Sequence, residues 1–194
     1  YSDPENSAVL FRTDINGSET MKILQDGNFS PKNWFVQNGF IYYQSLQTRS
    51  IQRARIDGSD SFQLIKTQAV SDLSVENRFM QRDSATYHLK LIDGSFLYFV
   101  IETDADQYAN YRASGVYRIP VTGGRPELIT DKIPVSINMD DDWLYMAVQG
   151  QGKSQLLKYR KDGSQVLTIN EYKENDMPGN IYMHNSSIYY SLLR

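Results

Sequence analysis

The feature that most constrains this chain is a pair of short sequence motifs that alternate, each occurring four times. The first motif has a basic residue in its third column and a glycine in its eighth. The second motif runs from an apolar residue through a polar turn into an apolar strand, and its seventh residue is always tyrosine. Repetition at such a period is typical of folds that stack one small unit several times. The first motif occupies residues 10–17, 51–58, 116–123 and 156–163, and the second occupies 36–43, 92–99, 139–146 and 183–190.

Three invariant columns define the residues on which the repeat depends. Each glycine follows Asn, Asp or Thr, which is typical of a hairpin turn because glycine adopts the positive φ that such turns require. Successive tyrosines are 56, 47 and 44 residues apart. The basic column consists of Arg12, Arg53, Arg118 and Lys158, the glycine column of Gly17, Gly58, Gly123 and Gly163, and the tyrosine column of Tyr42, Tyr98, Tyr145 and Tyr189.

Each unit predicts four short strands. The first strand enters the glycine turn, the second is brief and apolar, the third precedes a polar turn, and the fourth carries the tyrosine. Four strands in about 40–50 residues is the spacing of a β-propeller blade, and no long segment has the 3.6-residue period of a helix. We therefore predict an all-β fold of four four-stranded antiparallel propeller units, in a single repeat domain over residues 1–194. The predicted units are residues 8–44, 49–101, 114–148 and 154–194.

Two segments depart from the repeat. Residues 67–86 lengthen the second unit, and within them residues 71–80 predict a short helix that Ser71 could cap. The connection after Tyr98 is also long. Since departures from a repeat map to loops on one face, often the binding face, we expect a ligand-facing loop there, with neutral variation in loop length as the alternative. The candidate residues are Glu102, Asp104, Asp106, Tyr108, Tyr111 and Arg112.

Residues 41–59 read Ile-Tyr-Tyr-Gln-Ser-Leu-Gln-Thr-Arg-Ser-Ile-Gln-Arg-Ala-Arg-Ile-Asp-Gly-Ser. This segment resembles the propeller repeat of the low-density-lipoprotein-receptor kind, in which a Tyr-Trp-Thr-Asp strand leads into an Ile-x-Arg-x-x-x-Asp-Gly-Ser strand. It is more similar to a bacterial family of propeller-like domains of unknown function. The resemblance covers all four units. No Trp-Thr-Asp follows the tyrosines, so the receptor's ligand chemistry does not carry over. The bacterial family implies an extracellular or cell-surface setting and supplies no catalytic residues.

Composition narrows the chemistry further. The net charge of −3 gives no electrostatic footprint for nucleic acid, and no apolar run is long enough to span a membrane. The absence of cysteine excludes thiolate sites. His88 and His184 have no Gly-x-Ser-x-Gly elbow beside them. The acidic residues at 102–106 and 140–142 could offer oxygens to calcium, but they do not match the twelve-residue calcium loop, and solvated turns are the preferred interpretation. We predict no catalytic residue, no metal and no cofactor.

The invariant columns have structural interpretations. We expect the tyrosine rings to be buried between blades, with each hydroxyl bonded to a carbonyl. We expect the basic side chains to pair with polar neighbours inside the blades. The alternative for the basic column is a ring of cations that binds an anion in a central channel.

We interpret the chain as a non-catalytic binding module that presents loop surfaces to a protein or a cell-wall glycan. The alternatives are a carbohydrate hydrolase or lyase that uses carboxylates over the channel, and an architectural repeat of a larger surface protein. The segment could be four blades of a larger propeller or a closed four-bladed ring. An open array would leave unpaired edge strands, which predicts a homodimer.

Overall fold

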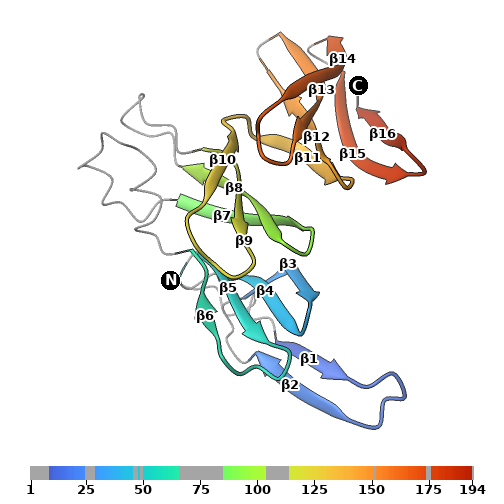
Figure 1. Ribbon diagram of the computed structural model, residues 1–194. Helices are drawn as coiled ribbons and strands as arrows, with labels where there is room; N and C mark the ends of the chain where they lie inside the picture. Colours follow the sequence, from blue (N-terminus) through green and yellow to red (C-terminus); the bar gives the residue numbers. More distant parts are fainter. Residues whose placement is uncertain are drawn as a thin grey trace. The chain divides into compact units, whose positions relative to one another are not determined.

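The computed structural model describes residues 9–24, 29–45, 48, 50–65, 85–103, 114–150, 152–173 and 176–193. All regular structure in these ranges is β, which confirms the predicted fold class (Figure 1). The helix predicted at 71–80 lies outside the described residues. None of the described residues forms a helix suited to crossing a membrane. The strands are β1 (Leu10–Thr13), β2 (Thr20–Leu24), β3 (Phe29–Gln37), β4 (Phe40–Ser45), β5 (Ser50–Arg55), β6 (Phe62–Gln63), β7 (Ala85–Ile92), β8 (Phe96–Thr103), β9 (Gly115–Pro120), β10 (Glu127–Thr130), β11 (Pro134–Met139), β12 (Trp143–Gln149), β13 (Lys153–Arg160), β14 (Val166–Lys173), β15 (Met177–His184) and β16 (Ser187–Leu193).

The strands form three four-stranded sheets and two two-stranded sheets. The larger sheets have the orders β3-β4-β5-β6, β10-β9-β8-β7 and β11-β12-β13-β14, and the smaller ones are β1-β2 and β15-β16 (Figure 1). Chain neighbours lie side by side, as in propeller blades. Each four-stranded sheet takes two strands from one sequence unit and two from the next. The sheets are therefore offset by two strands from the repeated units in the sequence.

The chain divides into two compact units. The first comprises residues 1–97 and 119–126, and the second comprises residues 98–118 and 127–194, so the division passes through the sheet β10-β9-β8-β7. Within the first unit, β7 contacts β3, β4 and β5. Within the second unit, β15 contacts β11, β12 and β13. In each unit, then, consecutive sheets cover one another.

The glycine turns have one geometry in all four hairpins. In each, the glycine N–H donates to the carbonyl three residues earlier over 2.8–3.0 Å, and the glycine φ lies between 73° and 90°. Asp57 and Asp162 complete their turns by accepting the backbone N–H and the hydroxyl of Ser59 and Ser164, respectively. The Asp-Gly-Ser sequence of these two turns thus satisfies its own backbone donors locally, which stabilises the hairpin there.

The strand after each turn carries a β-bulge in three of the sheets. The pairing register shifts by one residue, leaving Ile23, Ile129 and Ile169 as the extra residues in β2, β10 and β14. Counted from the turn glycine, these isoleucines and Leu64 occupy the same position. A bulge bends its strand and redirects its neighbours, so the repeat places the same kink in each of these strands.

The glycine turn of one sheet packs against the strand that follows the turn in the preceding sheet. A Cβ on Gly58 would lie 2.4 Å from the carbonyl oxygen of Ile23, and one on Gly163 would lie 3.1 Å from that of Ile129. A Cβ on Gly123 would lie 3.2 Å from the ring of Phe62. All four glycines of the column have a positive φ, and at Gly58 and Gly163 a side chain is excluded for a second reason, because the backbone of the preceding sheet lies so close.

We expect Gly58→Ala to destabilise the fold more than Gly39→Ala. Both glycines have a φ near 80°, but a Cβ on Gly39 meets nothing within 4 Å. The conformational cost alone should be about 1–2 kcal/mol in each variant. The contact with Ile23 should add at least about 2 kcal/mol for Gly58. Urea unfolding measures both losses, and equal losses would show that the approach of the two sheets contributes nothing.

Candidate functional site

The ligand-facing loop expected after Tyr98 is described only at its start. Glu102 is exposed near the end of β8. The other candidates, Asp104, Asp106, Tyr108, Tyr111 and Arg112, lie outside the described residues. The described surface on which a site can be built is therefore formed by the repeat columns and by the exposed side chains of β3 and β15-β16.

Arg53 joins the first four-stranded sheet to the turn of the next hairpin. Its guanidinium lies 4.4 Å from the ring centroid of Phe40 and 5.0 Å from that of Phe62. Its Nη1 donates to the carbonyl oxygen of Val121 over 3.0 Å. Stacking on two aromatic faces and a hydrogen bond to a fixed carbonyl both favour the planar guanidinium over an ammonium group. The side chain thus holds one strand layer against the next.

Arg118 makes the same kind of connection in the second unit. Its Nη1 donates to the carbonyl oxygen of Lys161 over 3.1 Å, while its Nε and Nη2 pair with Glu127. Val121 and Lys161 each stand two residues before the invariant glycine of their hairpins, so the two arginines contact equivalent atoms. These contacts give Arg53 and Arg118 a role in joining consecutive sheets.

The two remaining basic residues lie in different surroundings. Arg12 is exposed on β1. The Lys158 ammonium lies 4.5 Å from the ring centroid of Trp143, which also carries the Arg160 guanidinium at 4.3 Å. For Arg12 and Lys158, among the described residues, the structure thus shows no hydrogen bond to a following turn of the kind that Arg53 and Arg118 make.

The tyrosine column is buried in three positions and exposed in the fourth. Tyr42, Tyr98 and Tyr145 are 2%, 0% and 7% exposed, whereas Tyr189 is 56% exposed. The expectation that every ring of the column is buried is therefore wrong for Tyr189. Tyr145 is covered by the following strand β15, where it packs with Ile181. In the described part of the chain no sheet follows β15-β16, so the ring of Tyr189 stays on the surface.

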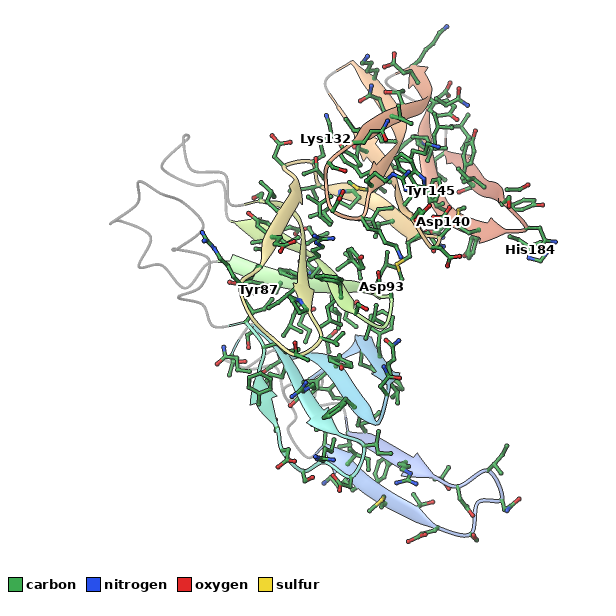
Figure 2. All side chains as sticks on the ribbon, viewed as in Figure 1. Tyr87, Asp93, Lys132, Asp140, Tyr145 and His184 are labelled. Atoms are coloured by element: carbon green, nitrogen blue, oxygen red, sulfur yellow. The ribbon has the colours of Figure 1, made fainter. Side chains whose placement is uncertain are left out.

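The hydroxyl of Tyr145 has a carboxylate partner, where the sequence predicted a carbonyl. It donates to Oδ2 of Asp140 over 2.6 Å, and Figure 2 shows the two side chains together beside the β11–β12 turn. The other oxygen, Oδ1, accepts the backbone N–H groups of Asp142 and Trp143. Asp93 closes the β7–β8 turn in the same way. Both carboxylates therefore hold turns.

These contacts shift the ionisation of the pair in opposite directions. Burial, and then the bond to the Asp140 carboxylate, raise the pKa of Tyr145 to about 12. Partial burial opposes ionisation of Asp140, but the hydrogen bonds from Tyr145 and from the two backbone N–H groups outweigh it, so the pKa of Asp140 is lowered. Asp140 is therefore a stable carboxylate, and Tyr145 keeps its proton across the physiological range.

The two histidines lie in different surroundings. His184 is exposed at the end of β15, beside the β15–β16 turn, and contacts the side chain of Asn185 (Figure 2). His88 lies partly buried in β7. Over the described ranges, no group of three or more His, Asp or Glu side chains is arranged to hold a metal ion.

Exposed apolar side chains on β3 and on the sheet β15-β16 are a surface feature that sequence reasoning did not identify. Tyr182, Tyr189 and Leu193 on β15-β16 are each more than half exposed. In the first unit, Trp34 and Val36 on β3 are 39% and 57% exposed. Exposed apolar groups of this size commonly mark interaction surfaces.

Comparison with known proteins supports the fold. No protein-family model matches the chain, and no curated protein matches it. Among solved structures, it is similar to a chain of the nidogen/laminin complex, with a TM-score of 0.60 and 14% identity over 95% of this chain and 64% of that one. It is also similar to an oligogalacturonate lyase in complex with manganese, with a TM-score of 0.63 and 10% identity over 93% and 51% of the two chains.

A third similar structure is TolB from Acinetobacter baumannii, with a TM-score of 0.53 and 13% identity, covering 97% of this chain and 47% of that one. The chain thus spans 64% or less of the length of each of these three structures. At such identities the likeness concerns the fold, and it supports the β-propeller class.

We expect Arg53→Ala to destabilise the first unit by about 2–3 kcal/mol, because it removes two aromatic contacts and leaves the carbonyl of Val121 without its donor. The control is Arg55→Ala on the same strand, whose partner Asp60 is exposed. That variant should lose less than about 1 kcal/mol. Urea unfolding measures both losses of stability. A loss for Arg53→Ala no larger than that for Arg55→Ala would contradict the role of Arg53 in joining the two sheets.

We expect Tyr145→Phe to raise the pKa of Asp140, because it removes the hydroxyl donor. A carboxyl whose pKa is lowered on folding stabilises the protein above its ordinary value of 3.8, and this stabilisation is lost as the pH falls. The variant should therefore lose about 1 kcal/mol at neutral pH and less in acid. Unfolding at both pH values tests this, with Asp140→Asn completing a double-mutant cycle. A loss independent of pH would indicate packing alone.

Proposed function

We propose that this chain is a non-catalytic binding module, exposed outside the cell, that presents propeller surfaces to a protein or a cell-wall glycan. The proposal rests on one observation, that the polar side chains of the repeat are engaged in hydrogen bonds that hold the scaffold. Asp57, Asp93, Asp140 and Asp162 accept hydrogen bonds within their own turns. Side chains committed in this way hold the scaffold and are poorly suited to proton transfer.

The surface that the fold leaves open favours contact over chemistry. Exposed aromatic and aliphatic side chains stand on β3 and on β15-β16, and such residues supply contact area in protein interfaces and stacking faces in sugar sites. Nidogen is seen in a complex with laminin, which is consistent with a propeller acting by binding. The extracellular setting rests on the sequence resemblance to the bacterial family.

The competing function is that of a carbohydrate lyase or hydrolase, which the likeness to an oligogalacturonate lyase brings forward at the level of the fold. A glycoside hydrolase needs two carboxylates that face each other across a cleft. An architectural repeat is the third reading. The three functions predict different results. A binding module binds its ligand without converting it, an enzyme forms product, and an architectural repeat does neither.

We expect the purified chain to bind members of a glycan and peptidoglycan-fragment array, or a defined extracellular protein, without converting oligogalacturonides. Product formation would be followed as unsaturated uronide absorbance and as reducing ends. Replacing residues 102–112 by a short Gly-Ser linker should weaken binding and leave the chain folded. Turnover of the oligogalacturonides would contradict the proposed function. Binding that survives the loop replacement would contradict the proposed binding surface.

A further inference from the structure

The turn between β1 and β2 differs from two of its sister turns at one position. Residues 57–59 and 162–164 are Asp-Gly-Ser, whereas residues 16–18 are Asn-Gly-Ser. In the two sister turns, Oδ1 of the aspartate accepts both the N–H and the hydroxyl of the serine. The hydroxyl of Ser18 donates instead to Oδ2 of Asp14 over 2.5 Å, because a carboxylate is a stronger acceptor than a neutral amide. Of the hydrogen bonds found among the described residues, none involves the side chain of Asn16.

An asparagine that precedes a glycine carries two groups that can react with each other. The backbone nitrogen of Gly17 can attack Cγ of Asn16, and no side chain on the glycine shields that nitrogen. A bond forms between this nitrogen and Cγ, while the bond from Cγ to the side-chain amide nitrogen breaks. The amide nitrogen leaves as ammonia with the proton of the Gly17 N–H. The product is a cyclic imide, a succinimide.

Water then opens the succinimide at one of its carbonyl carbons. Cleavage between the nitrogen and Cγ leaves an aspartate at position 16, which gives this turn the Asp-Gly-Ser sequence of its sister turns. Cleavage at the backbone carbonyl leaves an isoaspartyl linkage, in which the chain runs through Cγ and its backbone is longer by a methylene. In sum, water is consumed, ammonia is released, and nothing is oxidised or reduced. Either product adds a negative charge to the turn.

The position before the turn glycine is open to solvent in every repeat. Its residue is exposed even at Gly58 and Gly163, where the turn glycine packs against a preceding sheet. The access of water to this position is therefore a property of the turn itself and does not depend on what contacts β1-β2. The exposed residues of this column are Asn16, Asp57, Thr122 and Asp162.

The chain contains a matched comparison in the turn between β3 and β4. Asn38-Gly39 is also an exposed Asn-Gly pair, and a Cβ on Gly39 or on Gly17 would meet nothing within 4 Å. The two residues form the whole loop between the paired residues Gln37 and Phe40. Their φ angles of 51° and 79° are those of a mirrored two-residue hairpin turn. The two sites thus match in sequence, exposure and space, and they differ in how their backbones are held.

Cyclisation requires the asparagine to rotate its backbone so that the next nitrogen faces Cγ. At Asn38 this rotation disturbs the pairing of Gln37 with Phe40. It also disturbs the 3.1 Å hydrogen bond from the Ile56 N–H to the Gly39 carbonyl. The first turn of the next hairpin therefore helps to hold the β3–β4 turn in a conformation that does not cyclise.

The backbone at Asn16 is held less firmly. Residues 15–18 lie between Asp14 and Glu19, whose backbones are joined by a hydrogen bond of 3.1 Å. Within this longer loop, the rotation breaks the 3.0 Å bond from the Gly17 N–H to the Asp14 carbonyl and leaves the strand pairing intact. A local opening that breaks fewer hydrogen bonds is populated more often.

We propose that Asn16 is a site of spontaneous deamidation, at which the folded chain cyclises through Gly17 and hydrolyses faster than at the matched Asn38. The co-reactant is water, and the reaction is irreversible in solution because ammonia leaves. The inference concerns the covalent chemistry of the chain and is independent of the ligand that its loops bind.

Peptide mapping of the wild-type chain tests the proposal. The folded protein is incubated in mildly alkaline buffer made with water enriched in the heavy oxygen isotope, and trypsin then releases Asn16 in residues 13–22 and Asn38 in residues 33–49. We expect the 13–22 peptide to gain the mass of the heavy carboxylate at least about fivefold faster, the factor that one further backbone hydrogen bond would give. Asn16→Gln should stop this gain, because glutamine forms a larger ring. Equal rates, or a faster gain at Asn38, overturn the proposal.

The same incubation in concentrated urea separates the effect of the fold from that of the neighbouring residues. Once the turns are lost, both sites are Asn-Gly pairs in an unfolded chain, and we expect their rates to converge. Recognition of the 13–22 peptide by a methyltransferase specific for isoaspartate should confirm the second product. A difference between the two sites that persists unchanged in urea would show that the turns do not set the rates, and it would overturn the structural inference.

Discussion

The structure depends on the contact between a turn glycine and a bulged strand in the preceding sheet. A sheet of two to four short strands buries too little apolar surface to be stable alone. Gly58 on Ile23 and Gly163 on Ile129 bring consecutive sheets to backbone contact. That approach lets rings such as Tyr42 and Tyr145 lose nearly all of their exposed surface. Burial of each ring stabilises the array by a few kcal/mol, on the order of 1.5–3.

The polar residues of the repeat also hold consecutive sheets together. Arg53 and Arg118 reach carbonyls 68 and 43 residues away, and both carbonyls belong to turns that pack against the arginine's own sheet. The turn aspartates satisfy backbone donors that would otherwise need water. Because the charged groups of the repeat stabilise the scaffold, the inserted loops can vary without loss of stability. Such a separation of scaffold and loops is consistent with the proposed binding function.

The sequence was sufficient for features set by short-range chemistry. The four glycine turns, the strands beside them and the all-β class follow from turn propensity and from the repeat, and the structure has all of them. The division into sheets could not be read in the same way, because a repeat unit in sequence has no marker of which two strands begin a sheet. The acceptors of Arg53 and Arg118 and the carboxylate partner of Tyr145 also depend on packing between distant segments.

Tyr189 shows why a column can be invariant in sequence and still differ in environment. Its burial depends on a neighbouring sheet and not on its own strand, so the same residue type is 0% exposed at Tyr98 and 56% exposed here. A sequence column therefore predicts which residue type stands at each repeat position, whereas packing against a neighbouring sheet decides how much of that side chain is exposed.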